Sequence, residues 1–230
     1  MNRTIYQLIG AIAFSILPHV TLHAQNAEAL RDSLKQATEA LAYRPDSVDL
    51  RLKKAAWNML LEQWDYAKSE YDIILKYYPD NVAGLYYRGY ANQKLGRYNF
   101  ARLDYENLLK VVPGHFSGLL GLALLNQQDK HYTDAMNQIN TLVTLYPDSA
   151  VAYAARAGIE QERGMMDLAE YDYTEALNHH PNQQDYLLNR ADVRIKLGQF
   201  EKAKEDVERL VQLGVPRPGL LEWYRRQTKK

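Results

Sequence analysis

The side chains of this sequence that are able to do chemistry are its histidines and its carboxylates. His179 and His180 are adjacent, so on a helix they point in different directions and make a poor metal-binding pair. At the end of a helix they instead complement its negative dipole. His115 and His131 fall at expected turns, without carboxylates at metal-ligand spacing. The histidines therefore predict no metal site.

No catalytic motif accompanies them. The sequence contains no HExxH, no glycine-rich phosphate loop and no GxSxG. Glu160 and Glu162 are two residues apart, which puts them on different faces of a helix. Because no nucleophile stands beside a base, we predict no enzymatic activity, no catalytic residue and no cofactor.

Composition excludes further classes of function. Lys and Arg total 28, as do Asp and Glu, so the formal net charge is zero. Nucleic-acid binding needs a surplus of basic side chains, so we expect no nucleic-acid partner. The absence of cysteine excludes disulfides, thiolate metal sites and a lipid anchor on an N-terminal cysteine.

Charged residues recur instead in two sets, with an acid 16 residues after each base. The bases are Lys54, Arg88, Arg156 and Arg190, and the acids are Glu70, Asp104, Asp172 and Asp206. Where the basic position holds Leu122, the acidic position holds the neutral Gln138. This covariation predicts structural ion pairs, which hold geometry more than they add net stability.

A second polar set lies four residues after the basic positions. It consists of Asn58, Asn92, Asn126, Glu160 and Arg194. Residues four apart share a helix face, so the two sets predict an extended polar seam. A ligand-binding seam is the alternative.

The elements that position these residues repeat every 34 residues. Prolines stand at Pro45, Pro79, Pro113, Pro147 and Pro181, and four of them are followed by Asp or Asn. Alanine recurs at Ala67, Ala101, Ala135, Ala169 and Ala203, and small residues recur at Ala55, Gly89, Ala123, Ala157 and Ala191. Two helices per repeat explain this pattern, because small residues let paired helix backbones approach. Glycine in stretches such as Leu95-Gly96-Arg97 ends the first helix.

This pattern resembles the tetratricopeptide repeat, a 34-residue unit of two helices. The resemblance is carried best by Leu85, Gly89, Leu95-Gly96, Tyr98, Ala101, Tyr105 and Pro113. It implies an all-α fold, an α-solenoid of about five helix-turn-helix repeats over residues 48–215. Because solenoid ends need covering, we expect a capping helix, a half-repeat, at residues 25–44. A second capping helix with a basic tail is expected at residues 216–230.

The N-terminus has the layout of a secretory signal peptide over residues 1–24. A polar start with Arg3 precedes an apolar run from Ile5 to Leu17, and Ala24 suits the residue before the cut. The run is shorter than the roughly 20 residues needed to cross a bilayer. We therefore predict export to the periplasm or outer envelope of a bacterium, with no integral span after cleavage. An uncleaved N-terminal anchor is the alternative.

The resemblance also implies where a partner binds, because the first helices of such repeats line a concave groove. Carried over by position, the groove residues are Tyr86, Tyr90, Gln93, Leu120, Leu124, Gln127, Gln128, Gln161, Leu188 and Asp192. Aromatic, aliphatic and amide groups with few charges suit an extended peptide or an amphipathic helix. Alternatively, Tyr86 and Tyr90 simply pack between helices.

The predicted function is that of a protein-interaction scaffold or adaptor with a protein or peptide partner. A binding module for a small ligand, such as a glycan or a peptide fragment, is the alternative, and a deep pocket around Tyr86 and Tyr90 would favour it. Self-association through the terminal caps is also left open.

Overall fold

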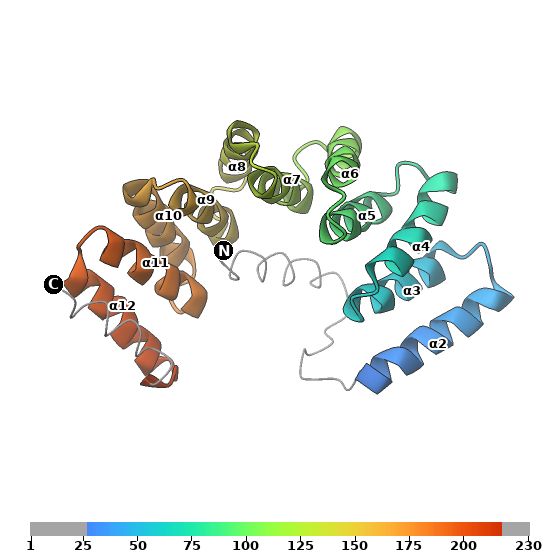
Figure 1. The fold of residues 1–230 in the computed structure, drawn as a ribbon, viewed down its shortest axis with the longest axis horizontal. Coiled ribbons are helices and arrows are strands. Elements are labelled where there is room, and N and C mark those ends of the chain that lie inside the picture. Colours follow the sequence, from blue (N-terminus) through green and yellow to red (C-terminus); the bar gives the residue numbers. More distant parts are fainter. Residues whose placement is uncertain (1–26, 218–230) are drawn as a thin grey trace. The chain divides into compact units, whose positions relative to one another are not determined.

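The computed structural model describes residues 27–217, and this part of the chain is all-helical (Figure 1). It contains eleven α-helices and no strand, as the repeat pattern predicts for the fold. The expected signal peptide, and residues 218–230 of the expected C-terminal segment, lie outside the described residues.

The helices follow one another as a single helix and then five pairs. The single helix is α2 (Ala27–Tyr43). The pairs are α3 (Val48–Leu60) with α4 (Trp64–Tyr77), α5 (Val82–Lys94) with α6 (Tyr98–Val111), α7 (Phe116–Gln128) with α8 (Tyr132–Leu145), α9 (Ala150–Glu162) with α10 (Met166–His179), and α11 (Gln184–Lys196) with α12 (Phe200–Gln212). Each pair occupies one 34-residue repeat, and we call its first member helix A and its second member helix B.

Each helix A begins three residues after the repeated proline. The side chains of Ser47, Asn81 and Ser149 cap it by accepting a hydrogen bond from the backbone N–H three residues later. His115 fills the same role with Nδ1, which accepts from the backbone N–H of Gly118 at 3.2 Å. Burial lowers the pKa of His115, which favours the neutral imidazole that is able to accept. The Asp or Asn directly after the proline lies in the turn instead.

The turn between helices A and B needs a left-handed residue. Gly96 has φ 71° and Gly198 has φ 73°, in line with the expected ending of helix A at glycine. At the equivalent place in the first repeat, Glu62 adopts φ 57°, a conformation that is strained for a residue with a Cβ.

The described residues divide into two units. The first covers residues 27–131 and contains α2 to α7, and the second covers residues 132–217 and contains α8 to α12. The division falls inside the third repeat, between its two helices.

The core of the first unit is built around Tyr105, which is fully buried. Its ring lies against two glycines, one from its own repeat and one from the next. A Cβ added at Gly121 would lie 2.9 Å from Tyr105 Cζ, and one added at Gly89 would lie 3.0 Å from Cε1. The small residues therefore make room for the aromatic ring, which is the relation that the sequence columns imply.

The second unit packs in the same way around Tyr173. This ring is buried in a core with small residues from both helices of each pair, including Ala157, Ala169, Ala191 and Ala203. All five alanines of the helix B column, in both units, are fully buried. A larger side chain at any of them would have to displace its neighbours.

Candidate partner-binding surface

The four predicted ion pairs between helices A and B are present in the structure. The distances are 2.6 Å for Lys54 Nζ to Glu70 Oε1, 2.6 Å for Arg88 Nη2 to Asp104 Oδ1, 2.5 Å for Arg156 Nε to Asp172 Oδ2, and 2.6 Å for Arg190 Nη2 to Asp206 Oδ1. The acids are buried and the bases half-buried. Each pair thus ties together the two helices of one repeat.

The arginines also reach back to the preceding repeat. Arg88 Nη1 donates to Asp72 Oδ1, Arg156 Nη1 to Asn140 Oδ1, and Arg190 Nη1 to Thr174 Oγ1, each at 3.1 Å. All three acceptors lie 16 residues before the arginine. The sequence analysis missed this link, although the shared acceptor chemistry of Asp72, Asn140 and Thr174 was its signal. One guanidinium therefore holds three helices.

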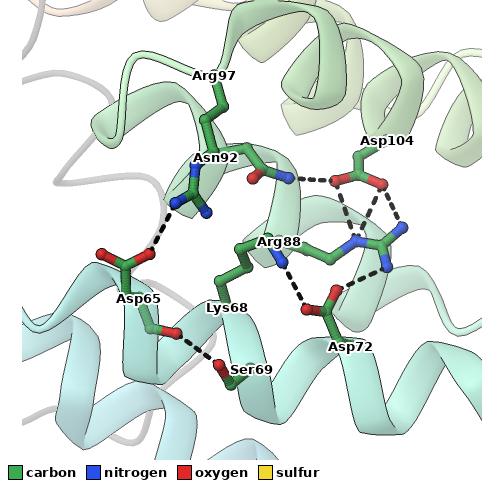
Figure 2. A network of polar contacts seen from close by, with 8 residues as sticks. All are labelled: Asp65, Lys68, Ser69, Asp72, Arg88, Asn92, Arg97 and Asp104. Carbon is green, nitrogen blue, oxygen red and sulfur yellow. Dashed lines mark hydrogen bonds and ion pairs between the residues drawn. The ribbon is translucent and has the colours of Figure 1, made fainter.

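Figure 2 shows this network around Arg88. Asp104 accepts from Arg88 and, at 3.0 Å, from Asn92 Nδ2, while Asp72 is shared by Arg88 and Lys68. Burial raises the pKa of Asp104, and the bonds from Arg88 and Asn92 oppose that rise without cancelling it. This carboxylate therefore depends on its two donors to stay charged.

The polar seam on helices A is buried at all five positions. Asn126 Oδ1 accepts from Arg102 Nε at 2.9 Å, and Arg194 pairs with both Glu170 and Asp206. Arg102 and Glu170 each lie 24 residues before their partner, on the preceding helix B. These buried side chains therefore bond to neighbouring helices, as expected for a structural seam, and do not form an open surface for a ligand.

Glu160 is the one acid of the seam. The position 24 residues before it holds Met136, so no base or hydrogen-bond donor reaches it from there. Its Oε2 is buried with no hydrogen-bond partner among the described residues. Burial, reinforced by the neighbouring Asp172 and opposed by Arg156, raises the pKa of Glu160 to about 8. Glu160 is therefore mostly protonated at neutral pH.

In the first unit, the predicted groove residues include a chain of hydrogen-bonded amides. Gln93 Oε1 accepts from the Tyr105 hydroxyl at 3.3 Å, and Gln93 Nε2 donates to Gln128 Oε1 at 2.9 Å. Gln128 Nε2 in turn donates to the Tyr98 hydroxyl oxygen at 2.7 Å. Gln93 is buried and Gln128 half-buried, so the chain runs from the core of the unit towards its surface.

The other groove residues of this unit are buried in the structure. Tyr86 belongs to the core, with its ring 5.0 Å from that of Tyr87 and 6.0 Å from that of Tyr105. Tyr90 meets Trp64 edge-on at 5.9 Å, and Lys94 Nζ lies 5.3 Å from its ring centre. Burial raises the pKa of Tyr90 to about 12. Leu120, Leu124 and Gln127 are buried as well. Tyr86 thus packs between helices, which is the alternative to a groove position.

The second unit repeats the amide chain with its own residues. Gln161 Oε1 accepts from the Tyr173 hydroxyl at 3.3 Å, and Gln161 Nε2 donates to Asp192 Oδ2 at 2.8 Å. Lys196 Nζ lies 2.7 Å from the same Asp192 oxygen. Asp192 and Leu188 are half-buried, while Gln161 is buried. The groove assignment of these ten residues stays a prediction.

The hydroxyls of Tyr105 and Tyr173 take part in these chains, a role that the sequence pattern did not reveal. The hydroxyls of Tyr105 and Tyr173 each bind the residue 12 positions earlier, and in the first repeat the Tyr71 hydroxyl likewise lies 3.0 Å from Met59 Sδ. Where the tyrosine is replaced by Val207, the earlier position holds Ile195, which needs no partner. In the third repeat, however, Gln127 stands 12 residues before Ile139, so the spacing alone does not predict the pairing.

Two further features concern the described residues only. Over residues 27–217, no group of three or more His, Asp or Glu side chains is gathered in a way that could hold a metal ion. None of the helices described is long and apolar enough to cross a membrane.

Comparison with known protein families and with curated proteins gives no match. Solved structures of tetratricopeptide repeat proteins do match. A tetratricopeptide repeat protein from Parabacteroides merdae ATCC 43184 is 18% identical, with a TM-score of 0.70 over 99% of this chain and 100% of that one. MamA from Desulfovibrio magneticus RS-1 is 18% identical, with a TM-score of 0.64 over 74% and 96%. YrrB, described as a TPR protein with an unusual peptide-binding site, is 16% identical, with a TM-score of 0.56 over 78% and 93%. The fold is therefore that of the tetratricopeptide repeat.

Proposed function

We propose that this chain is a protein-interaction scaffold of the bacterial cell envelope, which binds a peptide or an amphipathic helix on its helices A. The observation that supports it best is the duplicated amide chain. Tyr105–Gln93–Gln128 in the first unit and Tyr173–Gln161–Asp192 in the second unit each lead from a buried hydroxyl to a half-buried polar group.

Such a chain favours recognition because it fixes polar groups before a partner arrives. A side-chain amide held at both ends has lost its rotamer freedom already, so a partner that bonds to it pays less in ordering entropy. Leu188, half-buried on the same helix as Asp192, adds apolar contact area beside such a group. Amides next to apolar side chains are suited to the main chain and the side chains of a bound peptide.

The comparisons support a peptide partner at the level of the fold. YrrB has the same fold and is described as having a peptide-binding site. Export rests on the signal-peptide pattern of residues 1–24. Fractionation of cells that express the full chain tests this part. Recovery with periplasmic or outer-envelope markers is expected, and recovery with cytoplasmic markers would contradict export.

Affinity capture from envelope extract tests the binding surface. The test variant combines Gln128→Ala with Leu188→Ala, because both side chains are half-buried. The control combines Phe100→Ala with Leu103→Ala, two exposed apolar residues of α6, a helix B. Circular dichroism confirms that both variants fold. A protein retained by wild type and control but lost by the test variant supports the proposal. A protein lost only by the control variant places binding on helices B and contradicts it.

A further inference from the structure

The first repeat contains a hollow of about 280 Å³ that none of the preceding arguments uses. It lies between the turn that precedes α3, the start of α3 and the end of α4, all within the first unit. Its walls include Val48, Arg51, Ile73, Ile74, Tyr77 and Tyr78.

Arg51 breaks the pattern of its column. The equivalent positions in the other repeats hold Leu85, Leu119, Tyr153 and Leu187, and the three leucines are buried. The Arg51 guanidinium is instead held at the side of the hollow, with Nη1 3.0 Å from Glu70 Oε2 and Nη2 2.8 Å from the Pro45 carbonyl oxygen. An apolar residue that fills the core elsewhere is therefore missing here.

Ile73 breaks the pattern in the opposite sense. Its equivalents are Asn107, Thr141, Glu175 and Arg209, all polar. Next to it, Tyr77 and Tyr78 are 67% and 53% exposed, and Ile74 is almost fully buried. The hollow is thus lined by the apolar Ile73 at a position that is polar in the other repeats. It is also lined by the charged Arg51 at a position that holds leucine or tyrosine in them. Both inversions occur in one repeat and line one hollow.

The charges around Arg51 are nearly satisfied. Glu70 accepts from both Arg51 and Lys54, and Asp46 in the lining supplies a second carboxylate, so two acids stand against two bases. A guanidinium has five N–H groups, and the two hydrogen bonds of Arg51 among the described residues use two of them. The hollow therefore offers a donor beside an apolar wall, which suits a neutral ligand with an apolar group and one acceptor.

We propose that this hollow binds a bulky apolar side chain of an extended peptide, with Arg51 donating a hydrogen bond to the main-chain carbonyl next to that side chain. The volume fits this ligand, because sites for whole drug-sized molecules begin at about 300 Å³. Arg51 and Asp46 are the only charged residues in the lining. This site shares no residue with the ten predicted groove positions.

Methyl NMR of the full chain, labelled at isoleucine Cδ1, reads this site directly. The probes are N-acetyl-leucinamide and N-acetyl-phenylalaninamide, with N-acetyl-glycinamide as the control without a side chain. We expect the first two to shift Ile73 and Ile74 in a saturable way, and the control to leave them in place. Ile139, Ile159 and Ile195 lie outside the lining and should not move.

Two variants make the test specific. Arg51→Leu installs the residue type of the other repeats, so it should fill the hollow, keep or raise Tm and weaken probe binding at least tenfold. Ile73→Asn installs the polar residue found at Asn107 and should also weaken binding. Neither substitution touches Gln128 or Leu188, so failure here is distinguishable from failure of the proposed function.

Three results would overturn the proposal. The first is that neither apolar probe shifts Ile73 and Ile74. The second is that Arg51→Leu binds the probes as wild type does. The third is that N-acetylglucosamine, run in parallel, shifts these methyl groups while the amino-acid amides do not, which would make the hollow a saccharide site.

Discussion

Replacing Arg88 by leucine should destabilise the first unit more than replacing Arg88 and Asp104 together. The Asp104 side chain is only 2% exposed, and Arg88 supplies three of its hydrogen bonds, leaving one from Asn92. In Arg88→Leu, Asp104 keeps the Asn92 bond alone inside the protein. Breaking a buried pair in this way costs about 3–5 kcal/mol of the free energy of unfolding.

The chain itself provides the compensating change. The third repeat has Leu122 and Gln138 at the positions of Arg88 and Asp104, so a neutral solution for these two positions already occurs in the sequence. The double variant Arg88→Leu, Asp104→Gln copies that solution and leaves no buried charge. It loses the ties to Asp72 and Asn92, and we expect its cost to stay below about 2 kcal/mol.

Urea unfolding followed by circular dichroism at 222 nm measures both variants, together with Asp104→Gln alone. The pair Lys35–Glu39 gives the matched control, because both side chains are more than half exposed and 4.0 Å apart. Lys35→Ala should change stability by less than about 0.5 kcal/mol. The reasoning is refuted if the double variant loses the sum of the two single losses, since the two residues are then uncoupled.

Three further predictions follow from the geometry. Gly121→Ala should cost about 1–3 kcal/mol, because its Cβ would meet the buried Tyr105 ring at 2.9 Å, and thermal unfolding checks this. Glu62→Gly should raise stability by about 1 kcal/mol in urea unfolding, because it removes a left-handed strain at φ 57°; an unchanged midpoint would contradict the strain. Glu160 has a folded pKa of about 8 against its usual 4.5, so the folded state holds an extra proton between these values. Stability should therefore fall as pH rises from 4.5 to 8, and Glu160→Gln should remove that part of the fall, as urea midpoints across this range would show.

The sequence was sufficient to predict the helix pairs and the ion pairs within four of the five repeats. The 34-residue columns report helix packing directly, because Ala101 and Gly89 are small for a steric reason that recurs in every repeat. Arg88 and Asp104 are both replaced by neutral residues, Leu122 and Gln138, in the third repeat. This joint replacement indicates that Arg88 and Asp104 contact each other.

Contacts between neighbouring repeats were harder to foresee. The reach of Arg88 to Asp72 depends on how one repeat packs on the next, and spacing within one repeat carries no such information. The same limit applies to Gln93 and Gln128, whose bond joins two repeats. The hollow beside Arg51 could not be predicted from the sequence. Arg51 and Ile73 each differ from the residues at the equivalent positions, but only the structure shows that both line the same hollow.

Photo-crosslinking in living cells tests the central claim most directly. A benzophenone amino acid is placed at position 128 or 188 on helices A, and at position 100 on α6 as the control. The account predicts that one partner protein is crosslinked from positions 128 and 188 and is absent from position 100. A partner crosslinked from position 100 but from neither 128 nor 188 would contradict binding on helices A.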